Sequence, residues 1–264
     1  MRHLSRRRHT VPFRWITAFV LGGCLFAGAR QIRVDSSLSH PVLSARGNQT
    51  LFLKVSLTGF EVDDRERMPA NVALVIDQSG SMSGEKIEKA KEAAIMAVGR
   101  LSSRDVVSVV TYDSTVNVLV PATKLTDRES VIRKIRKLRS GGSTALFAGV
   151  SRGAAEVRKF FNRNRVNRVI LLSDGKANVG PDSAGELGSL GRSLGRELIS
   201  VTTIGIGYGY NEDLMAELAQ NSDGNHAFAQ TAEDLIAIFD REFEDVLSVV
   251  AQEVVNHIRC SDGV

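Results

Sequence analysis

A run of apolar residues from Val72 to Ile76 ends at Asp77, and two serines follow it, Ser79 and Ser81, with a glycine between them. A short, continuous apolar run predicts a strand that is buried on both faces, as in a parallel sheet. This strand should end in a cluster of oxygen atoms, which are the ligands that a hard cation such as Mg²⁺ prefers. Because Asp, Ser and Gly are also common where helices begin, a capped turn without metal is the alternative interpretation.

The net charge of the chain is +4, but the positive charge is concentrated near the N-terminus. Residues 1–29 contain no acidic residue and five arginines, Arg2, Arg6, Arg7, Arg8 and Arg14. The remainder holds 29 basic residues (34 minus 5) against 30 acidic ones and is close to neutral. This balance argues against a nucleic-acid partner, which would require a basic patch. With 264 residues, 43% of them hydrophobic, the chain can form one α/β domain and a smaller unit.

Residues 1–29 combine a basic start with an apolar run from Trp15 to Ala29, and they predict an export signal or an uncleaved anchor. Cys24 lies in a sequence similar to a bacterial lipidation site. The apolar run continues beyond it, so cleavage at Ala27-Gly28-Ala29 or an uncleaved anchor is favoured over a lipidated Cys24. The chain is expected to be exported, and to be periplasmic, at the cell surface or membrane-anchored in a bacterium. Cys260 is the second of two cysteines, so no disulfide framework is expected.

Four segments follow this leader. Residues 30–48 mix polar residues with single apolar ones and are expected to form a linker. Residues 49–68 are expected to form a flanking β-strand segment, in which the alternation of Leu51, Leu53, Val55 and Leu57 with the residues between them predicts a half-buried strand, followed by a charged stretch at 61–67. The main domain is expected at 69–250. Residues 251–264 contain a terminal β-strand, from Glu253 to Cys260.

Strands and helices alternate through the main domain. Strands are expected at 72–76, 106–112, 116–120, 167–173, 199–206 and 226–228, and helices at about 87–101, 127–138, 146–157, 182–198, 211–220 and 231–250. The link at 113–115 is so short that the strands beside it must be antiparallel. This order predicts an α/β fold: a doubly wound, mostly parallel sheet with one antiparallel edge strand and helices on both faces. Ligands bind beyond the carboxyl ends of such strands, where Asp77, Ser79, Ser81 and Asp174 are placed.

Three motifs, taken in chain order, resemble the von Willebrand factor A domain with its metal-ion-dependent adhesion site. They are Asp77-x-Ser79-x-Ser81, then Thr144 after a glycine pair and five residues before Gly149, then Asp174-Gly175 after an apolar strand. Each motif is short, and their weight comes from occurring together on the right elements. The resemblance covers about residues 71–250. The segments at 77–86, 167–175 and 211–215 are similar to the branch of inter-alpha-trypsin inhibitor heavy chains and their bacterial exported relatives.

The resemblance implies a divalent ion and the residues that would hold it. Ser79, Ser81 and Thr144 would offer hydroxyl oxygens, while Asp77 and Asp174 would balance the charge directly or through water. Mg²⁺ is the expected ion, with Mn²⁺ or Ca²⁺ as alternatives. An acidic side chain of a partner protein would complete the coordination. The expected function is therefore adhesion-type protein binding and not catalysis.

The flanking segments also relate to this family. In the inter-alpha-trypsin inhibitor branch, strands beside the A domain belong to a β-sandwich, and the strands within 49–68 and 251–264 have no place in the central sheet. They are expected to belong to a truncated β-sandwich, or to pair only with each other and leave exposed edges. Ser143 and Ser173 stand where other members often have different small residues, and neither is at a ligand position.

Other interpretations of the sequence are weaker. Gly205-Ile-Gly207-Tyr-Gly209 follows a strand, but it lacks the third glycine of a dinucleotide-binding turn and comes late in the sheet. His40, His226 and His257 have no partner at catalytic or ligand spacing, so an enzyme is not expected. The alternative function is a regulatory or scaffolding subunit of a larger machine, such as a metal-chelatase or ATPase partner. Such machines are cytosolic, whereas the leader predicts export.

Overall fold

The computed structural model describes residues 32–39, 50, 52–59, 67–174, 177–207 and 210–249. The leader at 1–29 and the terminal strand expected at 253–260 lie outside these residues, so both stay predictions. Within the described part of the chain, no helix is long and apolar enough to span a membrane.

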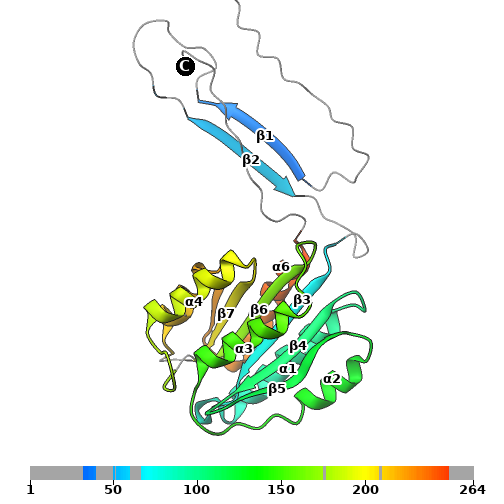
Figure 1. Cartoon of the computed structure of the whole chain (residues 1–264), viewed down its shortest axis with the longest axis vertical. Helices are drawn as coiled ribbons and strands as arrows, with labels where there is room; N and C mark the ends of the chain where they lie inside the picture. The colour runs from blue at the N-terminus through cyan, green and yellow to red at the C-terminus, as the bar shows by residue number, and fades with distance from the viewer. Residues whose placement is uncertain are drawn as a thin grey trace, which may run out of the picture. The chain divides into compact units, whose positions relative to one another are not determined.

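The main domain contains a central sheet whose strands lie in the order β5-β4-β3-β6-β7-β8 (Figure 1). These strands are β3 (Ala70–Asp77), β4 (Val106–Tyr112), β5 (Val116–Lys124), β6 (Val166–Ser173), β7 (Ser200–Ile206) and β8 (His226–Ala229). Strand β5 runs antiparallel to β4, and the other neighbouring pairs are parallel. The prediction of a mostly parallel sheet with one antiparallel edge strand is confirmed.

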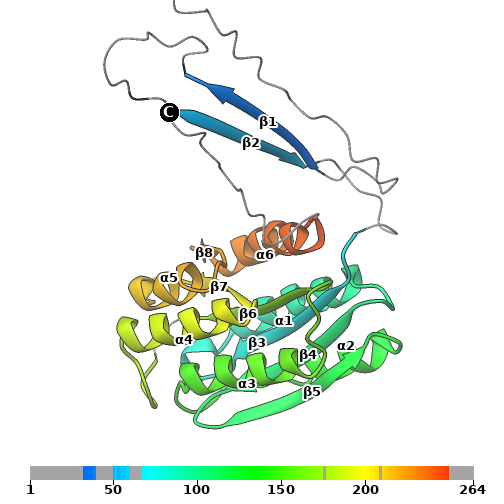
Figure 2. The same ribbon diagram turned by 45° about the horizontal axis from the view of Figure 1, so that its top comes forward.

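Helices cover both faces of this sheet (Figure 2). One face packs against α1 (Glu85–Arg100), α2 (Arg128–Ile135) and α6 (Ala232–Leu247), and the other against α3 (Leu146–Arg158), α4 (Ala184–Arg196) and α5 (Glu212–Gln220). Every residue of β3 and β4 is buried. These strands are mostly apolar because both of their faces contribute to a core.

Side chains at helix starts fix several of the helix boundaries. Four residues each accept a hydrogen bond from the backbone N–H three positions further on, namely Asp127, Ser183, Asn211 and Thr231. Ser183 and Thr231 form complete capping boxes. These acceptors satisfy N–H groups that the first turn of a helix leaves unpaired, and they thereby set where each helix begins. The four helices begin within two residues of the predicted positions.

The direction of winding reverses at β3. From β3 the chain proceeds to β4 and β5 on one side, then crosses to β6 on the other side and continues to β7 and β8. Open α/β sheets bind ligands at such a switch point, beyond the carboxyl ends of the two adjacent strands. Asp77 is the last residue of β3, and Asp174 directly follows β6. The topology therefore places both carboxylates at the switch point.

A separate two-stranded sheet consists of β1 (Ile32–Leu38) and β2 (Leu53–Gly59), which pair antiparallel. The predicted linker at 30–48 is therefore wrong for residues 32–38, where apolar side chains recur at alternate positions. Val34 and Leu38 lie opposite Leu57 and Leu53 on one face of the sheet. Leu53 and Leu57 are 42% and 45% exposed, so β2 is not half-buried as expected. A two-stranded sheet has no second layer of its own to cover this face.

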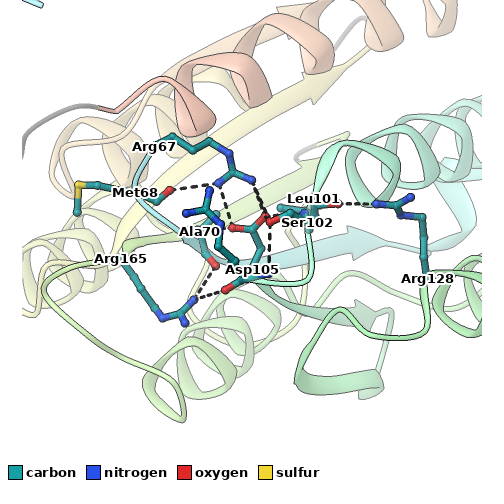
Figure 3. A network of polar contacts seen from close by, with 9 residues as sticks. Arg67, Met68, Ala70, Leu101, Ser102, Asp105, Arg128 and Arg165 are labelled. Atoms are coloured by element: carbon teal, nitrogen blue, oxygen red, sulfur yellow. Dashed lines mark hydrogen bonds and ion pairs between the residues drawn. The ribbon is translucent and has the colours of Figure 1, made fainter. Parts of the chain in front are cut away.

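A buried ion pair joins the amino ends of β3 and β4 (Figure 3). Asp105 is fully buried and accepts two hydrogen bonds from Arg67, from Nη1 to Oδ1 at 3.0 Å and from Nη2 to Oδ2 at 2.6 Å. The same carboxylate accepts from the backbone N–H of Ala70 at 2.7 Å and of Ser102 at 2.6 Å. The extra hydrogen bonds matter because a buried charge pair is costly unless its remaining lone pairs are satisfied.

We expect Asp105→Asn to lower the free energy of unfolding by about 3–5 kcal/mol, because it leaves the Arg67 guanidinium buried without its counter-ion. Urea unfolding at neutral pH measures the change. The control is Glu92→Gln, which removes an ion pair to Lys89 between side chains that are 52% and 25% exposed and should cost less than about 1 kcal/mol. Equal losses in the two variants would contradict a structural role for the Arg67–Asp105 pair.

The stability of the fold should also depend on pH through Asp105. Burial works to raise the pKa of this carboxyl, but the hydrogen bonds from Arg67, Ser102 and Ala70 together outweigh burial and place the pKa below its ordinary value. The stabilisation is complete above the ordinary Asp pKa of about 3.9 and is lost as the pH falls through the lower folded-state pKa. Urea unfolding below about pH 4 should therefore show a shallower pH dependence for Asp105→Asn than for the wild type. Identical slopes would refute this assignment.

Candidate metal centre

Oxygen atoms from two strand ends meet at the switch point. Ser81 Oγ donates a hydrogen bond to Asp174 Oδ1 at 2.9 Å, and Ser79 Oγ lies 3.1 Å from Ser81 Oγ. Ser79 and Asp174 are each 1% exposed, whereas Ser81 is exposed to solvent. The sequence predicted that these side chains lie close together, and the structure brings them together.

Asp77 lies beneath this cluster and is fully buried. Its Oδ1 accepts from the backbone N–H of Ser79 at 2.8 Å, and its Oδ2 accepts from Ser173 Oγ at 2.6 Å and from Tyr112 Oη at 3.3 Å. Burial is the main cause that raises the pKa of Asp77, and the charge of Asp174 raises it further, although the hydrogen bonds from Ser173 and Ser79 work in the opposite direction. The nearby Asp174 thus adds to the effect of burial in disfavouring the charged form of Asp77.

The capped-turn alternative is not supported by the helices that follow. The short 3-10 helix at Gly80–Met82 begins after Ser79, and α1 begins after Gly84, and neither start has a side-chain capping hydrogen bond. The oxygens of Asp77 and Ser81 therefore cap neither helix, although Asp77 Oδ1 does accept from the N–H of Ser79 within the turn. A capped turn would also leave unexplained why Asp174, from a different strand, joins the cluster.

Thr144 lies in a third loop, which main-chain hydrogen bonds anchor. The backbone N–H of Thr144 donates to Asn178 Oδ1 at 2.8 Å, and its carbonyl oxygen accepts from the N–H of Asn178 at 3.1 Å. This loop also contacts the first one, because the N–H of Gly80 donates to Gly142 O and the N–H of Gly141 donates to Gln78 O. The hydrogen bonds of Thr144 to described residues use its backbone, and none of them uses its hydroxyl.

Several residues that hold this site were not singled out as site residues in the sequence. Ser173 was placed outside the ligand positions, and its hydroxyl instead holds Asp77 from the end of β6. Tyr112 is paired in register with Asp77 across β3 and β4. Its ring lies against Gly149 of α3, where an added Cβ would be 2.5 Å from Tyr112 Cδ1. The available sequence signal was the position of Tyr112 and Ser173 at the ends of the two strands that flank β3.

Lys86 is the other residue that was missed. Its Nζ lies 3.0 Å from Asp174 Oδ2, and the two side chains are 28% and 1% exposed. Lys86 belongs to the first turn of α1. A lysine nine residues after Asp77 gives no signal of this contact in the sequence, because the contact joins α1 to a residue 88 positions further along the chain.

The residues present fit a hard divalent cation. The described residues contain no group of three or more His, Cys, Asp and Glu side chains placed to hold a metal. The cluster instead combines two carboxylates, Asp77 and Asp174, with hydroxyl groups. Such an oxygen-only set suits Mg²⁺, Mn²⁺ or Ca²⁺ and is poorly suited to softer ions that prefer sulfur or imidazole. The paired buried carboxylates also supply a negative charge that a cation would neutralise.

Fold and site together define a class of protein. The family model described as von Willebrand factor type A domain matches residues 71–241, so the chain belongs to this family. The resemblance that the motifs indicated is confirmed.

Curated relatives support the assignment. An uncharacterized protein of Synechocystis, sll0103, is 27% identical over 75% of this chain and 46% of its own length. Human inter-alpha-trypsin inhibitor heavy chain H2 is 29% identical over 65% of this chain and 19% of its own length. The chain thus spans less than half the length of these relatives.

Solved structures share the fold. A von Willebrand factor type A protein from Catenulispora acidiphila has a TM-score of 0.63 and 18% sequence identity, and the match covers 82% of this chain and 50% of that one. Proximal thread matrix protein 1 from the mussel byssus, solved with a zinc-occupied MIDAS motif, has a TM-score of 0.54 and 20% identity over 67% of this chain and 47% of that one.

We expect Ser173→Ala to destabilise the protein in EDTA by about 1.5–3 kcal/mol, because it removes a short hydrogen bond to a buried charged group. Tyr112→Phe should cost less, since its hydrogen bond to the same Asp77 oxygen is 3.3 Å long. Chemical unfolding of both variants gives the comparison. A larger loss for Tyr112→Phe than for Ser173→Ala would show that Asp77 is held differently.

Proposed function

We propose that this chain binds a divalent ion at the switch point and uses the ion to capture an acidic side chain of a partner protein. Ser79, Ser81 and Thr144 offer hydroxyl ligands, and Asp77 and Asp174 balance the charge directly or through water. The observation that carries the proposal is the Ser79–Ser81–Asp174 hydrogen-bonded chain above buried Asp77, built from separate loops. Mg²⁺ is the proposed ion, and Mn²⁺ or Ca²⁺ are alternatives.

The chemistry of the ligands explains why such an ion would bind a carboxylate. Hydroxyl groups are neutral, so an ion held mainly by them keeps most of its positive charge at any open coordination position. A carboxylate is a strong ligand for a hard cation. The exposed Ser81 marks the side of the site that a partner can reach. The zinc-occupied site of the mussel protein supports metal binding by this kind of motif.

We propose binding as the function and not catalysis. In the described part of the chain the one histidine is His226, and its ring nitrogens lie 2.9 Å from Thr203 Oγ1 and 3.1 Å from Tyr210 Oη. These contacts hold His226 among structural partners and do not aim it at Asp77 or Asp174. A metal-activated water would need a general base beside it.

We also propose that the chain works outside the cytosol, at a membrane or cell surface, because its leader has the pattern of an export signal. Membrane attachment would use the N-terminal segment or a lipidated Cys24. A subunit role in a cytosolic machine is the competing function. Fusion of residues 1–29 to a reporter that is active only after export separates the two, since failure to export would favour the cytosolic role.

The sharpest test of the metal site is Thr144→Val, which removes the hydroxyl and keeps the shape of the side chain. We expect this variant to match the wild type in stability in EDTA, because no described hydrogen bond uses the hydroxyl. Its affinity for Mg²⁺ or Mn²⁺ should fall at least about tenfold, as expected when a ligand is lost. Isothermal titration calorimetry of metal-free protein measures the affinity, and Mg²⁺ at about 100 times the dissociation constant should stabilise the wild type by about 2.7 kcal/mol.

The matched control is Thr123→Val on the exposed edge strand β5. It makes the same chemical change far from the cluster in sequence and should leave metal affinity unchanged. For the partner, affinity capture from the exported fraction should retain a protein in Mg²⁺ and release it in EDTA, and Asp77→Ala should retain none. The proposed function would be overturned if Thr144→Val bound metal as tightly as the wild type, or if the partner were retained equally in Mg²⁺ and in EDTA.

A further inference from the structure

The Lys86 ammonium contacts one of the two carboxylates of the proposed metal site. Its Nζ lies 3.0 Å from Asp174 Oδ2, while Ser81 Oγ occupies the other oxygen of the same carboxylate. Asp77 and Asp174 are both buried carboxyl groups, at 0% and 1% exposure. Among the described residues, Lys86 is the cation that forms an ion pair with this carboxylate pair.

The position of Lys86 is not explained by the stability of its own helix. Lys86 is the second residue of α1, where the helix dipole favours acidic side chains and disfavours a positive charge. The aliphatic part of the Lys86 side chain also occupies space next to Gly207, the residue that follows β7. A Cβ added to Gly207 would lie 3.1 Å from Lys86 Cε, and Gly207 has a φ of +77° that favours glycine. Both features point to a role at Asp174.

We propose that Lys86 is a built-in competitor of the divalent ion. The inference rests on the proposed metal site and adds how its affinity is set. In the metal-free protein the ammonium neutralises part of the charge of Asp77 and Asp174. A divalent ion held by the same oxygens meets this ammonium at close range, and like charges repel strongly where water is excluded. Lys86 therefore leaves Asp174 when the ion binds, and the loss of this contact lowers the affinity for metal.

The exposure of Lys86 allows this movement. At 28% exposure its ammonium can turn from Asp174 into solvent by a change of side-chain torsions, without a change in the backbone of α1. The displaced charge stays next to the site. Competition of this kind keeps the buried carboxylates stable without metal and limits metal binding to conditions in which the ion is abundant.

The test measures metal affinity in the full chain with Lys86→Met, which keeps most of the length of the stem and removes the charge. We expect Lys86→Met to bind Mn²⁺ about tenfold more tightly than the wild type, which corresponds to the loss of one charge-assisted hydrogen bond. In EDTA its thermal unfolding temperature should fall, because the carboxylates lose their counter-ion. Isothermal titration calorimetry and thermal unfolding provide the two values.

The control is Lys89→Met, which makes the same charge change one turn further along α1. Lys89 has a similar exposure of 25% and pairs with Glu92 instead of Asp174. A general change in charge would tighten Mn²⁺ binding equally in both variants, whereas competition tightens it only in Lys86→Met. Equal affinities in Lys86→Met and Lys89→Met, with metal bound by both, would overturn the inference and leave the metal site standing. Absence of metal binding in the wild type would overturn both proposals.

A second test of the competition between Lys86 and the divalent ion uses the wild-type protein. Lysine acylation followed by mass spectrometry reports how accessible each ammonium is. Lys86 should be labelled faster with saturating Mg²⁺ than in EDTA, and the labelling of Lys89 should not change. Unchanged or slower labelling of Lys86 would mean that the ammonium stays on Asp174 when the ion binds, and the competition would be refuted.

Discussion

The architecture of the site depends on the burial of Asp77 at the carboxyl end of the central strand. Its carboxylate accepts hydrogen bonds from Ser79, Ser173 and Tyr112, which come from the turn after β3 and from the strands on both sides of it. A buried carboxylate is costly unless such donors surround it. The donors therefore fix the ends of three adjacent strands relative to one another. This also sets the starting positions of the loops that follow these strands.

Buried carboxylates are neutralised differently at the two ends of the sheet. At the amino ends of β3 and β4, Asp105 is matched by Arg67, and both of its carboxylate oxygens also accept from backbone N–H groups. At the carboxyl ends, Lys86 is the cation that the described residues pair with Asp174, and none of them forms an ion pair with Asp77. The first arrangement stabilises the fold. The second leaves negative charge that a bound cation can neutralise. The contrast is the physical reason to assign function to the carboxyl end.

Much of this could be predicted from the sequence because the signals are local. The run that ends at Asp77 and the run that ends before Asp174 both predict buried strands, and parallel strands bring their carboxyl ends to one edge. Tyr112, Ser173 and Lys86 could not be assigned in the same way, since their contacts depend on strand register and on the position of the first turn of α1 beside Asp174. Strand β1 was missed because its alternation is interrupted by Ser36 and it needs a partner distant in sequence.

The central claim is that the clustered oxygens form one metal site. The most direct measurement is an anomalous difference map from a crystal of the protein soaked in Mn²⁺. We predict one strong peak in contact with the hydroxyl oxygens of Ser79, Ser81 and Thr144, next to Asp77 and Asp174, with Lys86 Nζ moved away from Asp174. A map with no peak among these oxygens at saturating Mn²⁺, or with the ion bound elsewhere, would contradict the account.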